Sequence, residues 1–133
     1  MSFVLDASVA ASWSFSDESS TIAALAYDRI QTEHVFVPTI LWFELRNTLI
    51  IAERRKRQTP IGTTSFLRSL LLHRITEDRS PVETDVLTFA RRHRLTVYDA
   101  AYLELAFRTG LELATLDTAL ATAAQAENVP LIA

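Results

Sequence analysis

The sequence predicts an α/β fold in which helices cover both faces of a parallel sheet. Short apolar segments alternate with longer segments of helical periodicity along the chain, and this alternation is typical of strands joined by right-handed helical crossovers. The 133 residues are 49% hydrophobic and 22% charged, an ordinary composition for a globular protein. Only two glycines occur and no stretch is rich in Gly, Ser or Pro, so we expect a single domain over residues 1–133.

The N-terminal part predicts two strands and two helices in alternation. Residues 3–5 form an apolar run too short for a helix, so a buried strand is expected there. Apolar residues at helical spacing predict a helix over residues 17–31, and residues 35–37 predict a second buried strand. Pro38 stops that strand and suits the first turn of the next helix, which continues to the basic run at residues 54–57.

The middle of the chain predicts two helices on either side of a short strand. Pro60 opens the first of these helices, and an apolar segment near Ile75 predicts the strand. Pro81 begins the second helix, which is expected to end near His93.

The C-terminal part repeats the alternation. Residues 95–97 have an extended pattern and lie directly before a helix that Gly110 ends. Residues 111–115 predict another strand, residues 117–127 an Ala-rich helix, and residues 129–132 a last apolar segment.

Composition and charge exclude several classes of protein. No run approaches the roughly 20 apolar residues that cross a bilayer, and no basic segment precedes the first apolar stretch, so we expect a cytoplasmic protein with no membrane contact. Without cysteine, disulfide frameworks and thiolate metal sites are excluded. The net charge of -3 argues against a protein that binds nucleic acid by bulk positive charge. The basic runs at residues 54–57 and 91–94 are either local phosphate contacts or the solvated ends of helices.

Four acidic residues are candidates for one site. Asp6 and Asp117 each follow a predicted strand, and ligands of parallel sheets bind beyond the carboxyl ends of the strands. Glu44 flanks the apolar row of its helix, so we expect it at a boundary and not in open water. Asp99 stands at another predicted junction before a helix.

Each of these acids also has an ordinary explanation. Asp6, Asp99 and Asp117 fit helix N-caps, and Glu44 alone would be an acid on a helix surface. Clustered carboxylates, however, repel one another and raise each other's pKa, so a fold gains little by gathering them unless a cation or a proton takes part. The set of four therefore indicates a functional site.

Carboxylate oxygens without Cys or paired His suit a hard cation such as Mg²⁺ or Mn²⁺, which supports phosphate hydrolysis. Ser8 and Thr115 each lie two positions from a candidate acid, where a hydroxyl either orients the acid or stabilises a turn. The sequence has no HExxH, GxSxG or glycine-rich phosphate loop, so zinc protease, serine hydrolase and nucleotide-loop chemistry are not expected.

Four segments carry a resemblance to a known family. They are VLDAS at residues 4–8, VP at 37–38 leading to ELRN at 44–47, YDAAYLELA at 98–106, and LATLD at 113–117. In this order and spacing they resemble the PIN-domain ribonucleases, and within them the VapC-type toxins of bacterial toxin-antitoxin pairs, over nearly the whole chain.

The resemblance implies a three-layer α/β/α sandwich with a central parallel sheet and endonucleolytic cleavage of RNA with Mg²⁺ or Mn²⁺. The residues it assigns to the metal site are Asp6, Glu44, Asp99 and Asp117, supported by Ser8, Asn47 and Thr115. It also implies a small antitoxin partner, whose C-terminal segment lies along a groove of the toxin and often brings a basic residue to the acids. Homodimers are common among similar proteins.

Other interpretations place acids at strand ends as well. A phosphotransfer receiver domain or an aspartyl phosphatase needs further groups: the only lysine, Lys56, lies in a basic run, and Asp6-Ala7-Ser8 lacks the second Asp of a DxD motif. A catalytically inactive PIN-like module that binds RNA or protein would keep the same fold. The presence of all four acids argues against that alternative.

Overall fold

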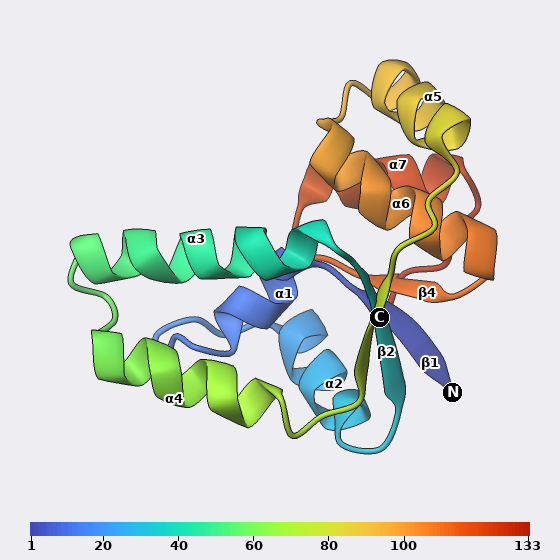
Figure 1. Ribbon diagram of the computed structural model, residues 1–133. Coiled ribbons are helices and arrows are strands. Elements are labelled where there is room, and N and C mark those ends of the chain that lie inside the picture. The colour runs from blue at the N-terminus through green and yellow to red at the C-terminus, as the bar shows by residue number, and fades with distance from the viewer.

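The computed structural model describes all residues 1–133 and contains a four-stranded sheet. The strands are β1 (Ser2–Leu5), β2 (His34–Pro38), β3 (Ile75–Asp78) and β4 (Glu112–Ala114). Their order across the sheet is β3-β2-β1-β4, and every neighbouring pair is parallel (Figure 1). The predicted α/β fold with a parallel sheet is therefore confirmed.

Helices cover the sheet in two groups. They are α1 (Ala7–Ser12), α2 (Thr21–Ile30), α3 (Ile40–Arg54), α4 (Pro60–Leu70), α5 (Glu83–His93), α6 (Val97–Thr109) and α7 (Thr118–Ala126). The connections from β1 to β2 to β3 advance one way across the sheet and the connection from β3 to β4 returns, so right-handed crossovers place α1–α4 and α5–α6 on opposite faces. Figure 1 shows α5, α6 and α7 gathered on one side and α1–α4 on the other, which is the predicted three-layer sandwich.

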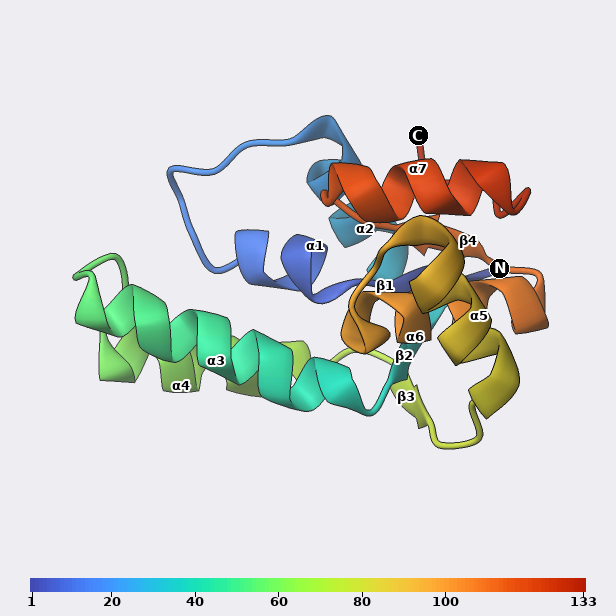
Figure 2. The same cartoon turned by 90° about the horizontal axis from the view of Figure 1, so that it is seen from above.

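The helices α3 and α4 form an arm that extends from the sheet in both views (Figures 1 and 2). Thr59 caps α4 by accepting a hydrogen bond from Gly62 N (3.0 Å), with Pro60 in the first turn as predicted. Within the arm, Thr63 Oγ1 donates to Glu53 Oε2 (2.7 Å), which joins the two helices near their connection. None of the helices combines the length and the apolar character that crossing a bilayer requires.

The strand order reverses between β1 and β4, and this point positions the candidate site. Leu5 pairs with Ala114, and the next residue, Asp6, continues the ladder by donating its backbone N–H to Ala114 O (3.0 Å). The carboxyl ends of β1 and β4 therefore lie side by side. In parallel sheets, such a reversal is where ligands bind.

The core explains why β1 shows no alternation of polar and apolar residues. Phe3, Val4 and Leu5 are all completely buried, because β1 is a central strand with helices on both faces. In contrast to β1, β3 is an edge strand, and its residues are only partly buried or exposed. One cluster of 32 buried hydrophobic residues joins the sheet to the helices.

The helix expected to start at Pro38 begins later. Pro38 is the last residue of β2, where its fixed φ suits an extended strand end, and α3 begins at Ile40 after Thr39, whose side chain makes no capping hydrogen bond. The helix predicted over residues 17–31 also begins later, at Thr21, because Ser20 Oγ accepts a hydrogen bond from Ala23 N (3.3 Å).

The end of the chain differs from its predicted extended segments. Residues 95–97 form no strand: Thr96 caps α6 and Val97 is its first residue. Gly110 ends α6 with a φ of 71°, as predicted. In the segment 129–132 a single isolated bridge joins Leu131 to Leu113, so this segment lies beside β4 without forming a named strand.

Candidate active site

Asp6 is held at the strand reversal by two hydroxyl groups. Ser8 Oγ donates to Asp6 Oδ2 at 2.6 Å, and Thr115 Oγ1 donates to the same oxygen at 2.7 Å. Ser8 lies in α1 on the β1 side, whereas Thr115 directly follows β4. The side chain of Asp6 therefore joins the two central strands where they end.

The two hydroxyls are the donors in these hydrogen bonds, because an ionised carboxylate has no proton to donate. Leu116 N donates to Ser8 Oγ and Asp117 N donates to Thr115 Oγ1, each at 3.0 Å. A hydroxyl can donate its single proton and accept a hydrogen bond at the same time, so each residue links Asp6 to the backbone after β4. The predicted orienting role of Ser8 and Thr115 agrees with this geometry, and both contacts leave Asp6 Oδ1 without a side-chain partner.

Asp117 is both a helix N-cap and an acid of the candidate site. Its Oδ1 accepts a hydrogen bond from Leu120 N (3.0 Å), which caps α7. The same side chain lines the cavity described below together with Asp6. Capping fixes one carboxylate oxygen and does not remove the residue from the site.

Glu44 lies on α3 and is fixed by a residue that the sequence did not single out. Tyr102 on α6 is completely buried, and its hydroxyl donates to Glu44 Oε1 at 2.6 Å. Burial and the neighbouring carboxylate raise the pKa of Tyr102 far above its usual value, so the phenol stays protonated and remains a donor. The only sequence signal was its spacing: Tyr102 is three residues after Asp99 and shares its helix face.

The four predicted acids line a single cavity of about 330 Å³. Asp6 and Ser8 come from the end of β1 and from α1, Glu44 from α3, Asp99 from the first turn of α6, and Asp117 from the residue before α7. These segments are separated widely in the sequence and meet at the carboxyl edge of the sheet. Asn47, by contrast, is exposed on α3 and is not among the lining residues.

The electrostatics of the cavity show that three of these carboxyls resist ionisation. Burial raises the pKa of Asp6, and the charge of Asp117 adds to the effect, while the two hydroxyl hydrogen bonds oppose it. Burial also raises the pKa of Glu44, with further contributions from Asp6 and Asp99. The pKa of Asp99 is raised by burial and by the charges of Asp117 and Asp6. The cavity therefore favours an added positive charge.

Comparison with known proteins identifies the family. The sequence profile of the PIN domain matches residues 3–126. The chain belongs to the PIN-domain family. This PIN domain is 32% identical over 127 residues to Ribonuclease VapC3 of Pyrobaculum aerophilum, covering 91% of the chain and 93% of that relative. In fold it is similar to the crystal structure of PAE2754 from Pyrobaculum aerophilum, with a TM-score of 0.72, 22% identity and coverage of 92% of this chain and 84% of that one. The family resemblance predicted from the sequence is confirmed.

The donor set of this PIN domain consists of oxygen atoms, which fit a hard divalent cation. No three His, Asp and Glu side chains stand together in a geometry that could hold a metal ion. Two of the acids, Asp6 and Glu44, accept hydrogen bonds from hydroxyl groups that fix their side chains.

Proposed function

We propose that this PIN domain is an endoribonuclease that depends on Mg²⁺ or Mn²⁺ and binds the ion through Asp6, Glu44, Asp99 and Asp117. The main support is that these four acids, distant in sequence, line one cavity at the strand reversal. The name of its relative, Ribonuclease VapC3, supports RNA as the substrate. The raised pKa values of Asp6, Glu44 and Asp99 support a cation, because a divalent ion would stabilise carboxylates that burial, and then the charge of neighbouring acids, keep from ionising.

Each side chain then has a defined part in hydrolysis. A bound divalent ion would supply Lewis-acid activation of water and of the phosphate. Ser8 and Thr115 hold Asp6 in one orientation, and Tyr102 does the same for Glu44. Their hydroxyls act through the carboxylates and orient the donor oxygens before substrate arrives, which lowers the cost of assembling the site. Asn47, exposed and outside the cavity, would act only indirectly.

Removal of divalent ions is expected to stop the reaction. Purified protein should cleave RNA when Mg²⁺ or Mn²⁺ is added, and EDTA should abolish cleavage until excess ion is restored. A calorimetric titration with Mg²⁺ should show heat that depends on the carboxylates and is lost in Asp99→Asn. An inactive binding module would show RNA binding with neither cleavage nor that heat, and cleavage that resists EDTA would contradict metal dependence.

Loss of the Tyr102 hydroxyl is expected to weaken metal binding without unfolding the protein. Groups that orient metal ligands typically contribute about 10- to 100-fold in metal affinity or activity. Tyr102→Phe should therefore raise the Mg²⁺ concentration for half-maximal cleavage roughly tenfold. The control is Tyr98→Phe, one turn earlier on α6 at an exposed position. Equal half-maximal concentrations in Tyr102→Phe and the wild type would contradict a positioning role.

We also propose that the partner in the cell is a small antitoxin and that the protein forms a homodimer. Large apolar side chains remain exposed, among them Phe43, Leu71 and Leu72, and such surface is what a protein partner would cover. Induced expression should arrest growth, and co-expression of the neighbouring small gene should relieve the arrest. Sedimentation equilibrium of the isolated protein tests the dimer. Harmless expression of an active nuclease would favour a housekeeping role over a toxin.

A further inference from the structure

Arg57 is the one basic residue that lines the acidic cavity. The cavity's acidic lining residues are Asp6, Glu18, Glu44, Asp99 and Asp117. An enzyme that cleaves RNA must bring a phosphodiester anion close to those carboxylates, which repel it. A guanidinium at the rim of the cavity would offset part of that repulsion.

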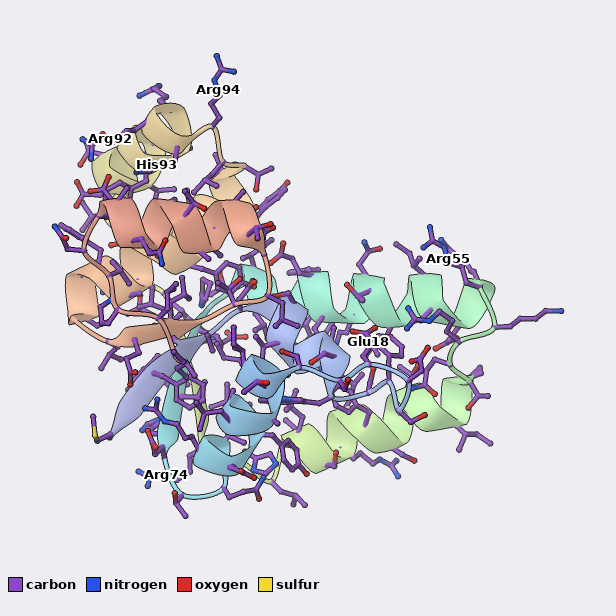
Figure 3. All side chains as sticks on the ribbon, turned by 180° about the vertical axis from the view of Figure 1, so that it is seen from behind. Glu18, Arg55, Arg74, Arg92, His93 and Arg94 are labelled. Atoms are coloured by element: carbon purple, nitrogen blue, oxygen red, sulfur yellow. The ribbon has the colours of Figure 1, made fainter.

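The fold directs Arg57 into the cavity and its neighbours elsewhere. The chain leaves α3 through Lys56, whose backbone is left-handed at a φ of 60°, and Arg57 N donates to Ala52 O (2.8 Å). Of the basic run at residues 54–57, only Arg57 forms ion pairs. Figure 3 shows the neighbouring Arg55 projecting from the end of α3 on the side away from Glu18.

Three residues of the α1–α2 connection hold the Arg57 guanidinium. It lies over the ring of Phe15, with 4.5 Å from Cζ to the ring centroid. Its Nη2 donates to Glu18 Oε2 at 2.9 Å and to Asp17 Oδ1 at 3.3 Å. Both hydrogen bonds use the same nitrogen, so Nε and Nη1 keep donors for another anion.

These contacts position the guanidinium, but the ion pairs of Arg57 with Asp17 and Glu18 are weak. The Arg57 side chain is 42% exposed and those of Asp17 and Glu18 are 72% and 40% exposed. Exposed ion pairs of this kind contribute little to stability, because solvent screens them. A phosphate oxygen pair matches the planar donors of arginine and can therefore bind to the Nε and Nη1 donors that Asp17 and Glu18 leave unused.

We propose that Arg57 binds a phosphodiester of the RNA at the mouth of the cavity and so holds the strand against the acidic site. This inference rests on the proposed function for its substrate class. Arg57 contacts the nonbridging oxygens through the donors that the protein leaves unused, while Phe15 keeps the guanidinium plane in place.

The test is RNA binding over a range of salt concentrations. In the Asp99→Asn background, which removes cleavage, affinity for a single-stranded RNA oligonucleotide is measured by fluorescence anisotropy. Losing one phosphate contact should reduce the slope of log K against log salt by about 0.7. Arg57→Met should also bind roughly tenfold more weakly, as expected for lost hydrogen bonds to a charged group. The matched control, Arg55→Met, removes the same charge from the same run outside the cavity and should change affinity less than about twofold, since it loses only long-range attraction.

A second variant distinguishes phosphate binding by Arg57 from a purely structural role, in which Arg57 only holds the α1–α2 connection in place. The double substitution Asp17→Asn with Glu18→Gln breaks the ion pairs but keeps Arg57. If Arg57 binds phosphate, this variant should bind RNA as tightly as the parent or more tightly, because competing negative charge is gone. Weakening equal to that of Arg57→Met, or equal salt slopes in Arg57→Met and Arg55→Met, would overturn the proposal. The binding assay needs no turnover, so its result is independent of whether the wild type cleaves RNA.

Discussion

Replacing Asp6 with Asn is expected to abolish RNA cleavage and at the same time to raise the thermal midpoint of the metal-free protein. Asn keeps the shape and can still accept hydrogen bonds from Ser8 and Thr115, but it removes the charge that would bind a cation. Metal activation supplies several kcal/mol of transition-state stabilisation, so cleavage should fall on the order of a hundredfold or more.

The stability gain follows from the direction of the Asp6 pKa shift. Burial raises the pKa of Asp6 in the folded state, so the folded protein holds this proton to higher pH than the unfolded chain. Stability from the protonated form is present below the ordinary carboxyl pKa of about 4 and is lost as pH rises through the folded value. The advantage of Asp6→Asn over the wild type should therefore grow as pH rises from about 4 toward neutrality.

Thermal melts at several pH values, with and without Mg²⁺, measure both effects. Added Mg²⁺ should raise the midpoint of the wild type by mass action and leave that of Asp6→Asn nearly unchanged. Asp28→Asn is the control, because Asp28 is an exposed acid on α2 that does not line the cavity. An Asp6→Asn protein that cleaves RNA at the wild-type rate, or that melts lower at neutral pH, would contradict the assignment of Asp6.

The sequence was sufficient to predict that Asp6 and Asp117 project from the same edge of the sheet, because each lies just past a strand of a parallel sheet. Topology alone brings those strand ends to one edge of the sheet. The pairing of Leu5 with Ala114 then places the ends of β1 and β4 side by side. Tyr102 could not be assigned in the same way. Whether a tyrosine in an apolar helix donates to a distant acid depends on the packing of α6 against α3, which no local pattern encodes.

Two other features of the structure could not be predicted from the sequence. The helix α1 follows Asp6 directly, and five of its six residues are buried, so it shows no polar face and no helical periodicity. Arg57 looked equivalent to Arg55 in the sequence, as members of one basic run. The left-handed turn at Lys56 and the ring of Phe15 distinguish them: the first is a backbone conformation that the residue type does not predict, and the second is a contact between distant parts of the chain.

Replacing Arg108 with Met is expected to cause a large decrease in the free energy of unfolding. Glu104 on α6 is 1% exposed, and Arg108 Nε donates to its Oε2 at 2.6 Å. Arg108 also donates to both carboxylate oxygens of Asp78 at the end of β3 (3.1 and 2.9 Å) and lowers the pKa of that acid. Val82 N adds a hydrogen bond to Glu104 Oε2 (3.3 Å), so this network joins the β3–α5 connection to the helix that carries Asp99.

Removing Arg108 would leave the buried Glu104 without a cation. Breaking a buried ion pair from one side typically costs about 3–5 kcal/mol, and the lower end applies because Arg108 is partly exposed. Denaturant unfolding should show a loss of about 3 kcal/mol, or roughly 10 °C in thermal midpoint.

The double substitution Glu104→Met with Arg108→Met tests whether that loss comes from an unpaired charge or from lost packing. With neither charge present, no buried carboxylate needs a partner, and apolar replacement of a buried pair is often neutral or stabilising. The double variant should therefore be more stable than Arg108→Met alone, and a double-mutant cycle measures the coupling. Arg79→Met is the control, since Arg79 pairs with Glu77 at 3.5 Å while 78% exposed, and its removal should change stability by less than about 1 kcal/mol. If the double variant lost as much stability as the sum of the single substitutions, Glu104 and Arg108 would contribute by packing and not as an ion pair.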